Sequence, residues 1–239
     1  MNKKTAHRLA RIFAWSVAGA MMVDHVADTG PLICTVDPTC RKMTVDEVAM
    51  ARPIFGDSLS YDKVLVFQRL PINRIFNSSA IALTHGNNIY LGPNMAPHRD
   101  DYGYARHPSW IETLPRYKDH AGVFVHELTH VWQYQRFGRP NIKSDLEYDF
   151  TLNPDTPFPS YNIEQQAEIV HHYFEKRRDI QDLQSFIAAR PPEIMQQIHL
   201  RQTLMSDCKE ARQYESLLKQ VLPIQPLIVC AAPVASPLP

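Results

Sequence analysis

The chain has 239 residues, 44% of them hydrophobic and 21% charged, so it is long enough and apolar enough to bury a core. Lys and Arg together number 25, as do Asp and Glu, and this balance argues against nucleic-acid binding and against attraction to an anionic membrane. Neither G-x-G-x-x-G nor G-x-x-x-x-G-K-[ST] occurs in the sequence, which argues against nucleotide chemistry.

Residues 1–27 have the pattern of a secretory signal. Lys3 and Lys4 precede an apolar run at residues 12–23, which is too short to span a bilayer comfortably, and Ala18 and Ala20 offer a small-residue cleavage site. An ordinary N-terminal helix packed on the domain is the alternative. We therefore expect a periplasmic or secreted protein without a stable transmembrane span, and a cytoplasmic location is the less favoured case.

The cysteine count favours the same compartment. Four cysteines are an even set that allows three disulfide connectivities. Pairing of sequence neighbours, Cys34 with Cys40 and Cys208 with Cys230, is the simplest arrangement in an oxidising compartment. Free buried thiols are the alternative. The spacing C-x-x-C is absent from the sequence, so a zinc site built from cysteines is disfavoured.

The first half of the chain predicts one helix and a small sheet. Thr44 and Glu47 form a capping-box pattern that begins a helix, and Gly56 ends it. Three short apolar runs predict strands: residues 63–69, 80–84 and 89–91. The sequence H-G-N-N between the last two runs consists of turn-forming residues, so we expect a β-hairpin there.

The second half predicts helices. One begins at Asp119 and runs to Phe137, where Gly138 and Pro140 stop it. Three further helical segments follow: one capped by Ser160 or Asn162 that ends near residue 179, one at about residues 180–190, and one at about residues 192–221. This order of elements predicts an α+β fold in a single domain at residues 28–230, followed by a disordered, Pro-rich tail at residues 231–239.

One motif dominates the chemistry: His126-Glu127-Leu128-Thr129-His130. Residues four apart share a helix face, so His126 and His130 can both present an imidazole to one metal ion. Zinc binds neutral imidazole nitrogen, and a catalytic zinc site needs three protein ligands and an open position for water. Glu127 lies beside the first ligand, where it can take a proton from the attacking water. A helix with two incidental histidines is the alternative.

A third ligand is expected from the next predicted helix, which carries E-Q-Q-A-E at residues 164–168. Two carboxylates four apart share a helix face and repel each other, so they need a cation or a hydrogen-bonded partner. One of them can bind zinc while the other orients a ligating histidine through its free ring N–H. A solvated helix face is the alternative for this pair.

Together, H-E-L-T-H and E-Q-Q-A-E resemble the gluzincins, zincin metallopeptidases whose third zinc ligand is a helical glutamate. The residues that flank both motifs, together with the sequence A-R-P-I-F-G-D at residues 51–57, are similar to the metallopeptidase domains associated with type VI secretion spike proteins. This similarity extends over about residues 44–179. It implies a zincin-like fold, in which a small sheet with a hairpin precedes the active-site helix and a helical C-terminal half.

Carried over to this sequence, the resemblance implies Zn²⁺ ligands at His126, His130 and Glu164, with Glu127 as the catalytic base. Glu168 is then the acid that orients a ligating histidine, at a position where gluzincins more often have Asp. The implied activity is hydrolysis of peptide bonds, in a protein or in peptidoglycan peptides, by an antibacterial enzyme of the bacterial envelope. A cognate inhibitor or immunity protein is the implied partner.

The sequence leaves three features of the site open. The donor to the developing oxyanion is Tyr148, Tyr161 or His171. Either strand of the predicted hairpin can be the edge along which an extended peptide pairs. A different class of function also fits the sequence: an exported or secretion-associated zinc-binding module without catalysis, which engages a partner protein and has a closed fourth coordination position.

Overall fold

The structure is a computed structural model, and it describes residues 34–35, 37–68, 82–92, 95, 120–138, 147–153, 155–189, 194–227 and 230. The signal-like segment at residues 1–27 and the predicted tail at 231–239 lie outside these residues. Within the described residues, no helix combines the length and the apolar character that crossing a membrane requires.

Helix α3 (Val45–Phe55) confirms the prediction from its capping pattern. The Thr44 hydroxyl accepts from the backbone N–H of Glu47 at 3.1 Å, and the Glu47 carboxylate accepts from the backbone N–H of Thr44 at 2.9 Å. Gly56 ends the helix with a φ of +50°, and a Cβ at this position would lie 2.8 Å from the Pro223 side chain. The helix end therefore packs closely on the C-terminal segment.

Four short strands form one mixed sheet: β1 (Cys40–Lys42), β2 (Leu65–Phe67), β3 (Ala82–His85) and β4 (Asn88–Leu91). Their order is β1-β2-β4-β3, with β2 and β4 parallel and the other two pairs antiparallel. The predicted hairpin is confirmed, and Gly86 in its turn has a φ of +61°. Because β4 lies between β2 and β3, only β3 of the two hairpin strands is an edge in the described sheet.

Three long helices follow: α5 (His120–Phe137), α6 (Ile163–Ala188) and α7 (Ile194–Leu218), with 3₁₀ turns at Tyr61–Lys63 and Phe158–Ser160. The predicted break near residues 179–180 is wrong, because α6 runs through it without interruption. Neither Gly nor Pro stands at this point, and the side chain of Ile180 is fully buried, so the apolar face continues across it.

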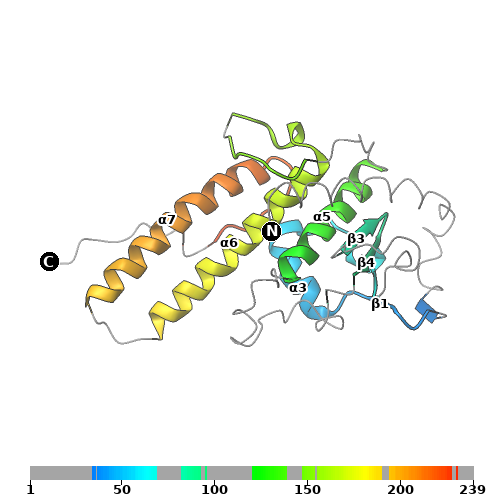
Figure 1. Ribbon diagram of the computed structural model, residues 1–239, viewed down its shortest axis with the longest axis horizontal. Coiled ribbons are helices and arrows are strands. Elements are labelled where there is room, and N and C mark those ends of the chain that lie inside the picture. The colour runs from blue at the N-terminus through cyan, green and yellow to red at the C-terminus, as the bar shows by residue number, and fades with distance from the viewer. Residues whose placement is uncertain are drawn as a thin grey trace, which may run out of the picture.

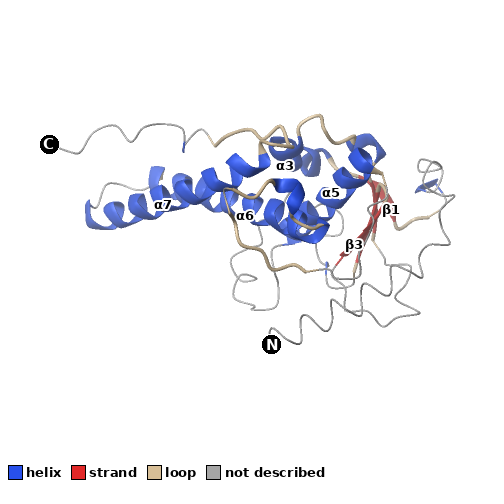
Figure 2. Ribbon diagram, turned by 90° about the horizontal axis from the view of Figure 1, so that it is seen from above, coloured by secondary structure: helices blue, strands red, loops and turns tan. Residues whose placement is uncertain are grey.

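The elements form successive layers. Figure 1 and Figure 2 show the sheet on one side of α5 and α6 on the other, with α7 against the outer side of α6. Because α5 is covered from both sides, its buried residues lie all around the helix. The largest fully buried side chains of the core join the sheet, α3, α5 and α6: Phe55, Ile89, Phe124, Leu128, Trp132 and Tyr173. This packing fixes α5 between the sheet and α6.

Both predicted disulfides are present. Cys34 pairs with Cys40, next to the first strand, and Cys208 of α7 pairs with Cys230. The second bond fastens the C-terminal segment to α7 across 22 positions of sequence, and both of its cysteines are buried. A cross-link of this kind restricts the unfolded chain and stabilises the helical layer.

Candidate metal centre

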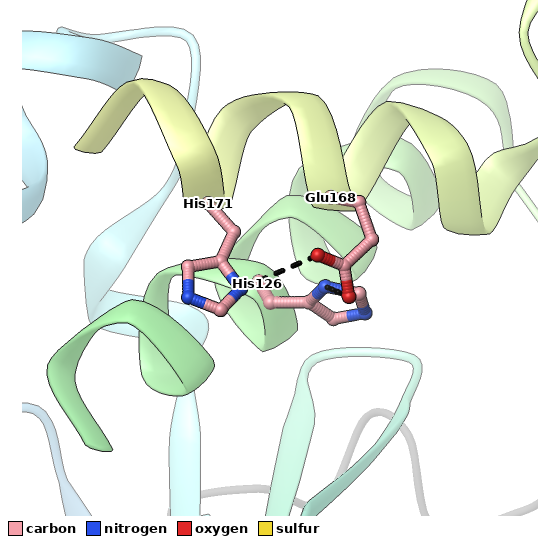
Figure 3. A group of neighbouring side chains, drawn as sticks. All are labelled: His126, Glu168 and His171. Atoms are coloured by element: carbon pink, nitrogen blue, oxygen red, sulfur yellow. Dashed lines mark ion pairs between the residues drawn. The ribbon is translucent and has the colours of Figure 1, made fainter. Parts of the chain in front are cut away.

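Polar side chains of α5 and α6 face each other where the two helices cross. His126 projects from α5 toward α6, and Glu168 and His171 project from α6 toward it (Figure 3). His126 is 8% exposed and His171 is 6% exposed. Buried ionisable groups of this kind need partners, because desolvation penalises their charged forms. The interface between the two helices is therefore a functional site candidate.

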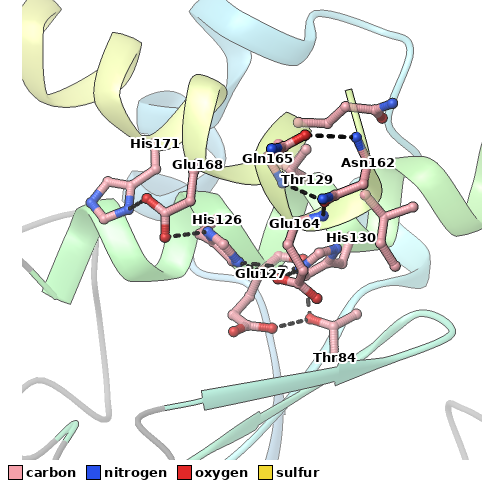
Figure 4. A network of polar contacts seen from close by, with 12 residues as sticks. Thr84, His126, Glu127, Thr129, His130, Asn162, Glu164, Gln165, Glu168 and His171 are labelled. Carbon is pink, nitrogen blue, oxygen red and sulfur yellow. Dashed lines mark hydrogen bonds and ion pairs between the residues drawn. The ribbon is translucent and has the colours of Figure 1, made fainter. Parts of the chain in front are cut away.

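Three ligand atoms converge in this interface. Nε2 of His126 lies 3.3 Å from Oε2 of Glu164, Nε2 of His130 lies 3.2 Å from the same oxygen, and the two nitrogens are 3.2 Å apart. The three residues thus form a group that could hold a metal ion (Figure 4). The turn spacing of the motif places both rings on one face of α5, as predicted.

The donor set and its dimensions fit a small divalent ion. A tetrahedral ion with ligands about 2.0–2.1 Å away keeps its ligand atoms about 3.3–3.4 Å apart. The three separations in the structure, 3.2, 3.2 and 3.3 Å, are close to this value. Two imidazole nitrogens and one carboxylate oxygen are also the ligand types that such ions take in proteins.

Gln133, one turn beyond His130, fixes which nitrogen of that ring is available. The Gln133 amide donates to the backbone oxygen of Ile163 and to Oε1 of Gln166, both at 3.0 Å, so its own oxygen faces the histidine. Nδ1 of His130 therefore donates to this oxygen, at 2.8 Å. The lone pair of a neutral His130 ring is then on Nε2, which faces the other two ligand atoms.

The start of α6 positions Glu164. Asn162 caps the helix by accepting from the backbone N–H groups of Glu164 and Gln165, each at 2.9 Å. Glu164 is consequently in the first turn, where the partial positive charge of the helix N-terminus stabilises a carboxylate. The cap thus places Glu164 in the first turn of α6, and a negatively charged side chain is stabilised at that position.

His130 and Glu164 shift each other's pKa in opposite directions. Burial by itself would lower the pKa of His130, but the carboxylates of Glu164 and Glu127 outweigh it and raise this pKa to about 9. Burial would likewise raise the pKa of Glu164, but His130 and His126 hold that pKa well below its usual range. A cation that binds here at neutral pH must therefore displace a proton from His130.

Glu127 lies beside this group and faces the sheet. Its Oε2 accepts a hydrogen bond of 2.7 Å from the hydroxyl of Thr84 on β3 (Figure 4). The same hydroxyl lies 3.1 Å from the backbone oxygen of Glu127. Glu127 is close enough to His130 to contribute to the raised pKa of that ring. The carboxylate is therefore held between the three ligand atoms and the edge strand.

Tyr148 reaches the site from the segment at residues 147–153. The N-cap region of α6 binds the backbone on either side of it: Asn162 donates to the oxygen of Glu147 at 3.0 Å, and Gln165 donates to the oxygen of Asp149 at 2.8 Å. The Tyr148 ring stacks on His126, with the two ring centroids 6.3 Å apart, and burial, Glu164 and Glu127 raise the pKa of its hydroxyl. The phenol thus keeps its proton at neutral pH.

The other two candidates for the oxyanion donor are placed differently. The Tyr161 hydroxyl donates to the backbone oxygen of Thr151 and accepts from the backbone N–H of Asn153, so it fastens the 147–153 segment. His171 lies behind His126, between Glu168 and Glu175. Neither hydrogen-bonds to a residue of the His126, His130 and Glu164 group in the described structure, whereas the Tyr148 hydroxyl is close enough to Glu164 for that carboxylate to raise its pKa.

Sequence reasoning missed Gln133 and Thr84. Gln133 offered a faint signal, since it is a polar residue three positions after His130 and so on the same side of the helix. Thr84 offered none, because its contact with Glu127 joins a strand to a helix 43 positions away. Glu168 was foreseen as a possible partner of a histidine, and it lies 3.6 Å from Nδ1 of His126.

The chain is 28% identical over 180 residues to the type VI secretion system spike protein VgrG2b of Pseudomonas aeruginosa. This chain is similar to part of a secretion spike. The alignment covers 70% of this chain and 16% of VgrG2b, so the chain spans only a small part of that relative's length. No protein-family profile matches the chain.

A solved structure, the effector domain of Pseudomonas aeruginosa VgrG2b, superposes on this chain with a TM-score of 0.46 and 24% identity. The superposition covers 71% of this chain and 87% of that domain.

Proposed function

We propose that this chain is a zinc metallopeptidase that hydrolyses peptide bonds in the bacterial envelope. The observation that carries the proposal is the convergence of Nε2 of His126, Nε2 of His130 and Oε2 of Glu164, with Glu127 next to them on the same helix. Two imidazoles and one carboxylate are a ligand set used by catalytic zinc, which keeps a fourth position open.

Each residue of the site would have its own role in the hydrolysis. Zinc, when bound, polarises a substrate carbonyl and lowers the pKa of a water molecule. Glu127 takes the proton of the attacking water and returns it to the leaving amine, while Thr84 holds its carboxylate in place. Tyr148, which keeps its proton and lies against the His126 ring, donates a hydrogen bond to the developing oxyanion.

The edge strand supplies a place for the substrate backbone. β3 is an edge in the described sheet, and its residue Thr84 contacts Glu127 directly. An extended peptide that pairs with an edge strand gains main-chain hydrogen bonds regardless of its side chains. Pairing along β3 would carry a peptide bond past Glu127, which supports β3 rather than β4 as the binding edge.

The place of action is inferred from the relative and from the disulfides. VgrG2b is named as a spike protein of the type VI secretion system, which supports a role for this chain in that system. The role proposed here is that of an effector, with an immunity protein as its partner. Two disulfides are typical of proteins that work in an oxidising compartment such as the periplasm. We therefore propose the peptides of the envelope, in protein or peptidoglycan, as substrates.

The test is hydrolysis by the zinc-loaded protein, measured on an unstructured protein substrate and on cross-linked peptidoglycan peptides. We expect Glu127→Gln to keep its zinc and to lose about 10²–10⁴-fold in kcat, because proton transfer is removed. Glu210→Gln on α7, which pairs with Lys176 away from the site, is the matched control and should retain activity. Full activity in Glu127→Gln would contradict the proposal, and zinc binding without any hydrolysis would favour the noncatalytic binding module.

A further inference from the structure

Glu168 lies on α6 one turn beyond Glu164, with three histidine rings around it. Its Oε1 is 3.6 Å from Nδ1 of His126, and its Oε2 is 3.6 Å from Nδ1 of His171 and 3.5 Å from Nε2 of His172. These separations are longer than a direct hydrogen bond, so electrostatic attraction and packing hold the carboxylate. Its position therefore depends on which of the neighbouring rings is itself fixed.

His171 is the fixed ring. Its side chain is buried, and its Nε2 lies 3.0 Å from Oε1 of Glu175, one turn further along α6. His172, by contrast, has a half-exposed side chain. A buried ring held by a carboxylate at one nitrogen has little freedom to move relative to the helix. His171 is therefore the more deeply buried and more firmly held of the two partners of Glu168 on α6.

Gly122 on α5 makes room for this ring. A Cβ at residue 122 would lie 2.4 Å from Nε2 and 2.6 Å from Cδ2 of His171, and 3.3 Å from Oε1 of Glu175. The first two distances are far below van der Waals contact, so any larger residue would displace the imidazole. Gly122 precedes His126 by one helical turn and lies on the same face of α5. The space that His171 occupies is therefore next to the His126 ring.

The cluster of His126, Glu168 and His171 has the residue types of a second metal site, and its ligand atoms lie within 4.8 Å of one another. Such a site would use Nδ1 of His126, whereas the group with His130 and Glu164 uses Nε2 of the same ring. A neutral imidazole has only one free lone pair, and its other nitrogen carries a proton. A metal at Nε2 therefore leaves an N–H at Nδ1, which Glu168 attracts.

We propose that His171 is a positioning residue for the metal ligand His126. It holds Glu168 so that one carboxylate oxygen faces Nδ1 of His126, Glu175 fixes the ring from behind, and Gly122 provides its space. Interactions behind a ligating histidine orient its ring and raise its affinity for the metal. This inference rests on the proposed function, since it requires a metal ion at His126.

The test compares His171→Ala, His171→Asn and His172→Ala in the full chain. Zinc affinity is measured by chelator competition, the geometry by the visible spectrum after loading with Co²⁺, and folding by the melting temperature without metal. We expect His171→Ala to weaken zinc binding by about 10-fold or more and to change the cobalt spectrum. His171→Asn places an amide N–H near Glu168 and should recover part of the zinc affinity and part of the spectrum, while His172→Ala, which removes the half-exposed ring, should have a smaller effect than His171→Ala.

Gly122→Ala tests the same relationship from the opposite helix. Alone it should weaken zinc binding by displacing His171, and combined with His171→Ala it should add no further loss, because the clash is gone. Unchanged zinc affinity and an unchanged cobalt spectrum in His171→Ala, with only a lower melting temperature, would overturn the inference, as would additive effects in the double variant. Failure of the wild type to bind zinc would instead overturn the proposed function itself.

Discussion

The hydroxyl of Thr84 on β3 lies 2.7 Å from Oε2 of Glu127 and 3.1 Å from the backbone oxygen of the same residue. A hydroxyl has a single proton, so it donates to one of these acceptors at a time. When Glu127 is ionised, Thr84 donates to the carboxylate. When Glu127 carries a proton, the hydroxyl can accept from the acid and donate to the backbone oxygen. Thr84 therefore supports the base in both of the states that proton transfer requires.

The first prediction concerns this hydrogen bond. We expect Thr84→Val, which keeps the shape but lacks the hydroxyl, to lower kcat by about 10-fold, the equivalent of about 1.4 kcal/mol. KM and zinc content should change little, because neither a ligand nor the strand edge is removed. Thr84→Ser should recover most of the loss. Steady-state kinetics of the three proteins checks this, and equal kcat in wild type and Thr84→Val would contradict it.

The second prediction concerns the amide behind His130. We expect Gln133→Met to weaken zinc binding by about 10–100-fold, because Nδ1 of His130 loses its acceptor and the ring loses its orientation. Gln135→Met is the matched control on the same helix, since Gln135 binds the backbone of Ser60 and the side chain of Asn87 instead. It should affect folding stability and leave zinc affinity unchanged. Equal zinc affinities for both variants would contradict the role of Gln133.

The third prediction concerns Tyr148. Tyr148→Phe should lower kcat by about 10²-fold, the size of effect seen when one oxyanion donor is removed, with zinc content unchanged. Tyr161→Phe should instead loosen the 147–153 segment, since that hydroxyl binds Thr151 and Asn153. A drop in kcat for Tyr161→Phe alone, with Tyr148→Phe fully active, would show that the donor was misassigned.

The fourth prediction concerns the proton that His130 releases when zinc binds. The pKa of His130 is raised to about 9, so this ring is protonated at pH 7 before a cation binds. Zinc binding at pH 7 should therefore release about one proton from the ring, and this release should disappear as the pH rises through 9. Calorimetry in buffers with different ionisation enthalpies measures the number directly. Binding at pH 7 without proton release would contradict the His130 and Glu164 pairing.

The same shift predicts how the stability of the metal-free protein changes with pH. A histidine whose pKa is raised in the folded state contributes stability that is fully present below its ordinary pKa of about 6.5. This contribution is lost as the pH rises through about 9. Urea unfolding at pH 7 and pH 10 should show a smaller pH dependence in His130→Gln than in the wild type. An equal dependence in both proteins would contradict the prediction.

Much of this architecture could be predicted because its signals are local. The capping box at Thr44 fixed the start of α3, the turn residues around Gly86 fixed the hairpin, and the four-residue spacing placed His126 and His130 on one face. Glu164 was expected from a resemblance, and the residues alone left it equal to Glu168. Its cap by Asn162 explains why it, rather than Glu168, lies in the first turn of α6 beside both Nε2 atoms.

The remaining features depend on tertiary packing, which the sequence does not display. The contact of Thr84 with Glu127 and the room that Gly122 leaves for His171 exist only once the sheet and α6 close on α5 from opposite sides. The continuity of α6 was missed for a similar reason. The local sequence near residue 179 is compatible with a helix end. The helix continues because Ile180 is buried among the packed helices.

The most direct measurement of the central claim is the zinc content of the purified wild type, Glu164→Ala and Glu168→Ala proteins after dialysis against a low, fixed concentration of free zinc. We expect about one zinc per wild-type chain, little or none in Glu164→Ala, and binding in Glu168→Ala that is weaker but saturable at higher zinc. A full complement of zinc in Glu164→Ala would contradict the assignment of Glu164, together with His126 and His130, as the metal-binding group.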